Sequence, residues 1–188
     1  MNEGLIPNRY AKALLKFATE CGLTERVYQL MLNLDASFVA EKGLTAVVRN
    51  PFIADDDKTS LLTTAAGATP DDTCFADFLT LLVRNGRLPL TREIALAYCS
   101  LYRKANDIRV VEVTTAYPVD AEERGRLEAL VKKQVGASKV EMNFIVAPDI
   151  IGGFVITIDS RRLDASITNQ LKQLRQQLIS KENNEQSQ

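Results

Sequence analysis

The sequence predicts an α+β protein, with a six-helix bundle over residues 1–105 and a small α/β domain over residues 106–180 that contains a three-stranded sheet and two helices. Two observations predict this division. Apolar residues recur every three or four positions up to about Asn106, and every second position in several segments after it. These are the periods of a helix face and of a strand face. With 46% apolar residues in a chain of 188, each part has enough material for its own core.

Apolar stripes and helix-ending residues predict the first three helices. The first stripe runs from Tyr10 to Cys21, and Gly22 ends that helix. A second stripe follows over residues 27–38. A short third helix ends before Asn50-Pro51, because the residue before a proline disfavours helical backbone.

Acidic residues open the next two helices. Asp55-Asp56-Asp57 precede the fourth helix, and Thr69-Pro70-Asp71-Asp72 combine a capping hydroxyl, an early proline and carboxylates at the positive end of a helix dipole. Adjacent carboxylates on a helix do not converge on one ion, so capping explains both clusters better than a Mg²⁺ site. The fifth helix ends at Asn85-Gly86, and the sixth begins at Pro89.

Alternating apolar residues predict three strands in the second domain, around Val111, over 140–146 and over 154–158. A helix that begins after Asp120 separates the first two. Gly152-Gly153 precede a strand rather than a helix, which indicates a close approach of two backbones and not a phosphate loop.

The last helix is expected to begin at Asp164, after a solvated corner at Arg161-Arg162, and the polar tail 181–188 is expected to be disordered. Its narrow apolar seam would pack on the sheet or on another helix. The seam consists of Ile167, Leu171, Leu174 and Leu178.

Composition excludes several classes of active site. The chain has no histidine, which excludes Ser-His and Cys-His nucleophile pairs and histidine-ligated metals, and no cofactor is expected. Cys21, Cys74 and Cys99 are predicted to be buried thiols in a reducing compartment. The chain shows neither a membrane-spanning run nor the features of a signal peptide, so a cytoplasmic protein is expected.

The first and fifth helices are apolar over more than one face. This pattern fits a central helix of a bundle and also a groove that accepts an amphipathic partner helix. The residues alone leave both interpretations open.

Five segments in order resemble the delta subunit of the F-type ATP synthase, the oligomycin-sensitivity-conferring protein of mitochondria. They are residues 9–14 (RYAKAL), 50–53 (NPFI), 78–88 (FLTLLVRNGRL), 148–154 (PDIIGGF) and 163–167 (LDASI). The resemblance implies a non-catalytic stator subunit that couples proton-driven rotation to ATP synthesis.

In that family the first domain binds N-terminal helices of alpha subunits in a groove between its first and fifth helices, and the second binds b subunits of the peripheral stalk. By position, the candidate groove residues here are Tyr10, Ala13, Leu14, Phe78, Leu81 and Leu82. The resemblance also implies a free monomer, present as one copy per complex. It would lie at the cytoplasmic side of a bacterial inner membrane without inserting.

The alternative is a small helical adaptor that binds RNA or a transcription complex. It would need a basic face, whereas residues 1–105 carry equal numbers of basic and acidic side chains and the whole chain has a formal charge of −1. An enzyme is the third hypothesis, and it would need clustered carboxylates or lysines in a pocket.

Overall fold

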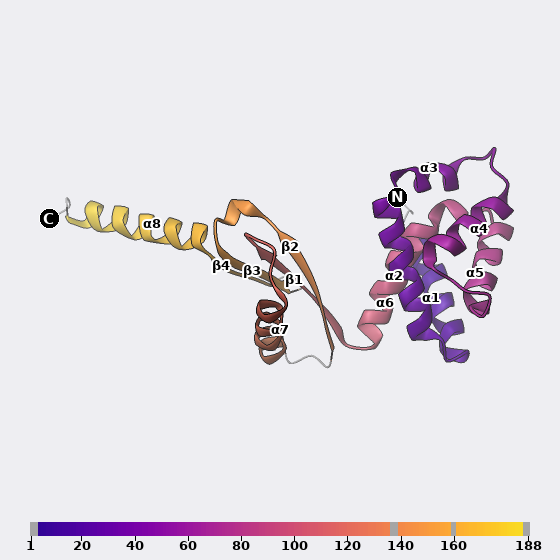
Figure 1. The fold of residues 1–188 in the computed structure, drawn as a ribbon, viewed down its shortest axis with the longest axis horizontal. Helices are drawn as coiled ribbons and strands as arrows, with labels where there is room; N and C mark the ends of the chain where they lie inside the picture. Colours follow the sequence, from indigo (N-terminus) through magenta and orange to yellow (C-terminus); the bar gives the residue numbers. More distant parts are fainter. Residues whose placement is uncertain (1–3, 136–138, 159–160, 186–188) are drawn as a thin grey trace. The chain divides into compact units, whose positions relative to one another are not determined.

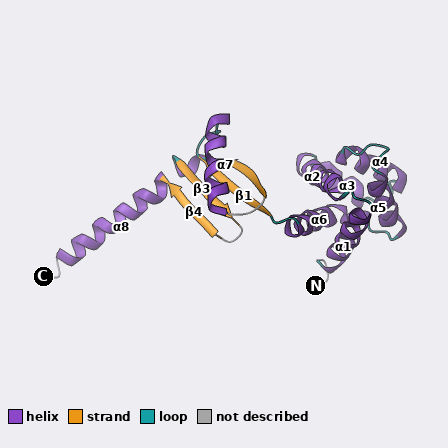
Figure 2. Cartoon of the chain, turned by 90° about the horizontal axis from the view of Figure 1, so that it is seen from below, coloured by secondary structure: helices purple, strands orange, loops and turns teal. Residues whose placement is uncertain are grey.

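The structure is a computed structural model that describes residues 4–135, 139–158 and 161–185 (Figure 1). The chain divides into two compact units, Met1–Ala105 and Asn106–Gln188. The first is helical and the second combines helices with one sheet (Figure 2), so the predicted α+β class is confirmed.

The first unit is built from helices packed around shared apolar side chains. Leu30 of α2, Leu82 of α5 and Tyr98 of α6 are among the fully buried side chains. The helices of its described part are α1 (Leu5–Glu20), α2 (Thr24–Ala40), α3 (Lys42–Arg49), α4 (Asp55–Ala66), α5 (Thr73–Arg84) and α6 (Thr91–Ala105), with a short 3₁₀ turn at Leu88–Leu90 before α6.

The start of α5 differs from the prediction. Residues 69–72 form a turn, and the helix begins at Thr73 instead of Pro70. The Asp72 carboxylate accepts hydrogen bonds from the backbone N–H of Thr69 at 2.8 Å and from the Thr69 hydroxyl at 3.0 Å, which closes the turn. Asp72 also faces Arg26 of α2, so this acid joins two helices rather than only capping one.

The prediction of three buried thiols is wrong for one of them. Cys74 and Cys99 are buried as expected, but Cys21 is exposed, because it lies just past the end of α1 where the packed surface of the helix stops.

The sheet of the second unit has four strands, not the three expected. Its order is β2-β1-β3-β4, with β1 parallel to β2 and antiparallel to β3, and with β3 antiparallel to β4. The strands are β1 (Ile108–Thr115), β2 (Lys139–Val146), β3 (Gly153–Ile158) and β4 (Arg161–Ser166).

The fourth strand takes up residues that were expected to form a corner and the start of a helix. Arg161 and Arg162 begin β4, and Asp164 lies inside it. An edge strand has one neighbour and keeps much of its surface in water, so polar residues serve there and the apolar alternation that marks a strand is weak. The last helix, α8 (Ile167–Glu185), begins after Ser166, whose hydroxyl accepts a hydrogen bond from the Asn169 N–H at 3.2 Å.

Helix α7 (Ala121–Val135) covers one face of the sheet (Figures 1 and 2). Val131 of α7 packs with Val111, Val113 and Ile156 from the two central strands. The register puts Glu112, Asn143, Thr157 and Arg162 side by side in a polar row on the opposite face.

Helix α8 contacts its own unit chiefly through β4 and the turn at Pro148–Ile150. Its apolar seam does not pack on the sheet: Leu171 and Leu174 are 55% and 56% exposed, and the Leu178 side chain lies outside the described residues. The helix extends to Glu185 and so includes residues 181–185 of the tail for which disorder was expected. Residues 186–188 lie outside the described part.

Candidate partner-binding sites

A groove of about 470 Å³ lies between α1 and α5. Five of the six candidate residues line it: Tyr10, Ala13, Leu14, Phe78 and Leu81. Leu82 does not, because it points into the core and is 0% exposed. The remaining lining residues, Phe17, Asp77, Thr80 and Arg84, were not among the candidates.

The groove has a buried apolar floor and an exposed apolar rim. Leu14 and Phe78 form the floor, since they line the groove and yet are buried. Phe17 and Leu81 remain 38% and 44% exposed. Large apolar side chains left in water beside a concave surface are typical of a binding groove and not of a central bundle helix.

Three of the missed residues are polar members of α5. Asp77 and Arg84 are exposed and lie seven residues apart, with Thr80 between them. An apolar stripe does not include polar residues, so apolar periodicity could not identify these three. Phe17, by contrast, could have been found from its spacing, since it follows Tyr10 by seven positions and Leu14 by three.

Burial keeps two titratable side chains of the helical unit in their neutral forms. Burial raises the pKa of the Cys74 thiol to about 11, so at neutral pH it is a protonated and unreactive group. Burial also raises the pKa of Tyr98, whose hydroxyl donates a hydrogen bond to the Thr24 carbonyl at 3.1 Å. The described residues contain no group of three Cys, Asp or Glu side chains that could hold a metal ion, Asp55–Asp57 included.

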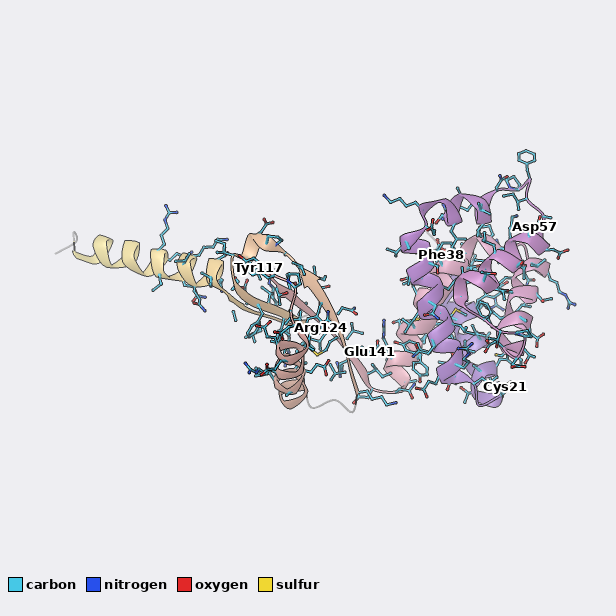
Figure 3. All side chains as sticks on the ribbon, viewed as in Figure 1. Cys21, Phe38, Asp57, Tyr117, Arg124 and Glu141 are labelled. Carbon is cyan, nitrogen blue, oxygen red and sulfur yellow. The ribbon has the colours of Figure 1, made fainter. Side chains whose placement is uncertain are left out.

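A second candidate surface lies in the unit that follows Ala105. A cavity of about 400 Å³ opens between the β1–α7 connection, the first turns of α7 and the start of β3. Tyr117, labelled in Figure 3, lines it and is exposed. Large exposed apolar side chains continue around Ile151 and along α8.

The Gly152-Gly153 pair lets β4 and the start of α8 pack closely beside this second surface. Gly153 has a φ of +76°, and a Cβ atom there would collide with the backbone of Ala165 in β4. A Cβ atom on Gly152 would lie 2.6 Å from Cδ1 of Ile167, the first residue of α8. The predicted close approach of two backbones is therefore confirmed.

In the part of the chain that the structure describes, every helix is too short or too polar to cross a membrane.

Comparison with known proteins assigns the chain to a family. The profile described as ATP synthase delta (OSCP) subunit matches residues 6–178. The ATP synthase subunit delta of Bacteroides thetaiotaomicron is 38% identical over 182 residues, which cover 96% of this chain and 97% of the relative. That of Bacteroides fragilis is 40% identical over 184 residues, with the same coverage.

The fold is also similar to a chain in the cryo-EM structure of the Toxoplasma gondii mitochondrial ATP synthase hexamer. The TM-score is 0.66 at 21% identity, and the match covers 92% of this chain and 97% of the other. Family membership disfavours the alternative of an RNA-binding or transcription adaptor. The resemblance seen in the sequence is confirmed, and the chain belongs to the ATP synthase delta (OSCP) subunit family.

Proposed function

We propose that this chain is the non-catalytic stator subunit that joins the catalytic head of the ATP synthase to its peripheral stalk. The observation that carries the proposal is the groove between α1 and α5, whose buried apolar floor and exposed apolar rim suit an amphipathic helix. Its occupant would be the N-terminal helix of an alpha subunit, in agreement with the family to which the chain belongs.

The second contact is assigned to the unit that contains the sheet. Leu171 and Leu174 of α8, together with the cavity beside Tyr117, offer apolar surface to the b subunits of the stalk. An exposed seam with spacings of four and three residues suits pairing with another helix.

The physics of both contacts suits a static link. Burial of apolar surface contributes about 25 cal/mol per Å² before the costs of association are subtracted. Two contacts on one chain also reinforce each other once both partners belong to one complex, because the second binding step becomes intramolecular. Slow dissociation then lets the subunit hold the head against the torque of the rotor, so that proton-driven rotation is coupled to ATP synthesis.

In this proposal the free subunit is a monomer, and one copy enters each complex. It lies at the cytoplasmic side of the bacterial inner membrane and is held there through the complex rather than by insertion.

The test is calorimetric titration of the full chain with a synthetic peptide of the alpha-subunit N-terminus from the same organism. We expect one-to-one submicromolar binding. Leu81→Asp is expected to weaken it at least a hundredfold, because it puts a charge on the rim of the groove that the guest covers.

The matched control is Leu96→Asp on α6, an exposed leucine that does not line the groove, and it should leave the affinity unchanged. Circular dichroism should show native helix content for both variants. Normal binding by a folded Leu81→Asp variant would contradict the groove assignment, and absence of binding by the unmodified chain would contradict the contact itself.

A further inference from the structure

We infer that the groove between α1 and α5 orients its guest, taking a cationic side chain of the guest helix at the Asp77 end and an anionic one at the Arg84 end. The inference rests on the proposed function, since it concerns the direction of the helix that the groove would hold. It is carried by the placement of charges along α1 and α5.

The two walls of the groove run in opposite directions. Nη2 of Arg26, in the first turn of α2, lies 2.7 Å from Oδ2 of Asp72, the residue just before α5. Helix α2 starts at Thr24, shortly after α1 ends at Glu20, so the start of α5 lies beside the end of α1. Figure 3 shows Cys21 at this end of the helical unit, opposite to Asp57.

This arrangement gives the groove an acidic end and a basic end. Asp77 lies toward Phe17 and the end of α1, whereas Arg84, the last residue of α5, lies toward Tyr10. Seven residues of helix separate the two charges by about 10 Å. Neither Asp77 nor Arg84 forms an ion pair with another residue of the described part of the chain, so both are available to a guest.

The charged side chains of α1 follow the same order, with a basic residue near Tyr10 and an acidic one near Phe17, or are neutralised by a neighbour. On α1, Arg9 precedes Tyr10 and Glu20 follows Phe17, although Glu20 lies 3.9 Å from Lys16. The dipoles of α1 and α5 oppose each other because the helices are antiparallel. The side chains therefore set the sign of the potential at each end.

The guest is thus a helix with apolar residues at spacings of three and four and, on its rim, one cation and one anion about seven residues apart. A unit charge on a side chain outweighs the half charge at a helix end, so the order of these two charges decides the direction of the guest. The opposite direction would bring like charges together at both ends. We expect a preference of about tenfold at low ionic strength, which salt should reduce.

The experiment uses two synthetic 14-residue peptides of equal composition with one apolar stripe, in which a Glu and a Lys seven residues apart exchange places. Each is made with a thiol-reactive bromoacetyl group at its N-terminal or its C-terminal end. Cys21 is the reporter, because its thiol is exposed at the acidic end of the groove while Cys74 and Cys99 are buried. Mass spectrometry of the full chain gives the rate of alkylation.

The peptide with Lys toward its C-terminus should alkylate Cys21 about tenfold faster from its C-terminal group, and the exchanged peptide should do so from its N-terminal group. Both preferences should reverse in the double variant Asp77→Arg, Arg84→Asp. Cys21→Ser should abolish alkylation, and Leu81→Asp should slow it for every peptide.

Different results would contradict the inferred polarity of the groove and its proposed role as a helix receptor. If both peptides bind but react through the same end whatever their charge order, the inferred polarity is wrong and the groove remains a helix receptor. If neither these peptides nor the alpha-subunit peptide binds, the groove is not a helix receptor, and the proposed contact with the head fails with it.

Discussion

Asp72 is a nearly buried carboxylate that links the turn before α5 to helix α2. The Nε and Nη2 atoms of Arg26 lie 2.8 and 2.7 Å from its two oxygens, and Thr69 adds two more hydrogen bonds. The Arg26 guanidinium holds the pKa of this carboxyl well below its ordinary value, and Thr69 lowers it further, while burial acts in the opposite direction. The ionised form of Asp72 therefore stabilises the fold.

Asp72→Asn is expected to lower the free energy of unfolding at pH 7 by about 2 kcal/mol, the size of a lost charged hydrogen bond. Because the native pKa lies below the unfolded value of about 4, the advantage of wild type is complete above that value and declines as the pH falls toward the native pKa. Urea denaturation of both proteins at pH 7, 4 and 3 measures the difference.

The neighbouring exposed acid provides the control, since Asp71→Asn should change stability little at any of these pH values. A difference between wild type and Asp72→Asn that stays constant down to pH 3 would show that ionisation of Asp72 is not its source.

Leu81 and Leu82 show how far single positions follow from the sequence. Both are leucines of one helix signature, and the family resemblance put both in the groove. The structure leaves Leu81 on the rim and puts Leu82 in the core. Apolar periodicity identifies helices that bury much of their surface, but adjacent residues on such a helix differ by about 100° in direction, and only tertiary packing decides which one faces a neighbour.

The pairing of strand β4 with β3 requires a glycine at position 153, in β3. The pairing brings Gly153 opposite Ser166, with the carbonyl of Ala165 where a Cβ atom would lie. Since β4 ends at the residue that precedes α8, this one glycine positions both elements.

Gly153→Ala is expected to cost about 2 kcal/mol or more in stability, because the side chain combines a positive φ with a collision against backbone. Gly125→Ala in α7 is the matched control: no heavy atom lies within 4 Å of the position that its Cβ would take, so this variant should gain about 1 kcal/mol from helix propensity. Thermal unfolding of both variants followed by circular dichroism gives the comparison. Equal stability of the two would refute the role of Gly153.

Helices and strands with a strong apolar period were predicted well, and solvent-exposed elements with a weak period were predicted poorly. Helix α2 and strand β1 have buried stripes that the sequence displays. Helix α1 was placed correctly, but it buries Pro7, Ala11, Leu14 and Ala18, and of the predicted stripe only Leu14 and Ala18 are buried. Strand β4 is polar, so it lacks the alternation of apolar residues that would predict a strand. The Asp164 carboxylate accepts a hydrogen bond from the Ser166 N–H at 3.1 Å, a contact that resembles a helix cap but lies two residues before the true cap at Ser166.

The two candidate surfaces belong to different compact units, so each should be separable by mutation. Leu171→Asp with Leu174→Asp is expected to abolish binding of a fragment taken from the C-terminal part of a b subunit, because two charges would enter an apolar helix seam. Binding of the alpha-subunit peptide should stay within about twofold, and stability should change little since both leucines are exposed.

Co-purification of the full chain with the b fragment, followed by calorimetry with the alpha peptide, measures both contacts on one sample. Leu81→Asp is the reciprocal control and should retain the b fragment. Loss of both contacts in either variant would argue against independent surfaces.

Strand β1 is the first strand after α6 and occupies the interior of its sheet. It pairs through eight residues with β2 and through five with β3. In the proposed stator role, tension that arrives through α6 would enter at Ile108 and act along β1, where it would strain the hydrogen bonds on both sides together instead of unzipping them one by one. A chain held in this way would meet the load in a shearing geometry, in which many interstrand hydrogen bonds resist it together.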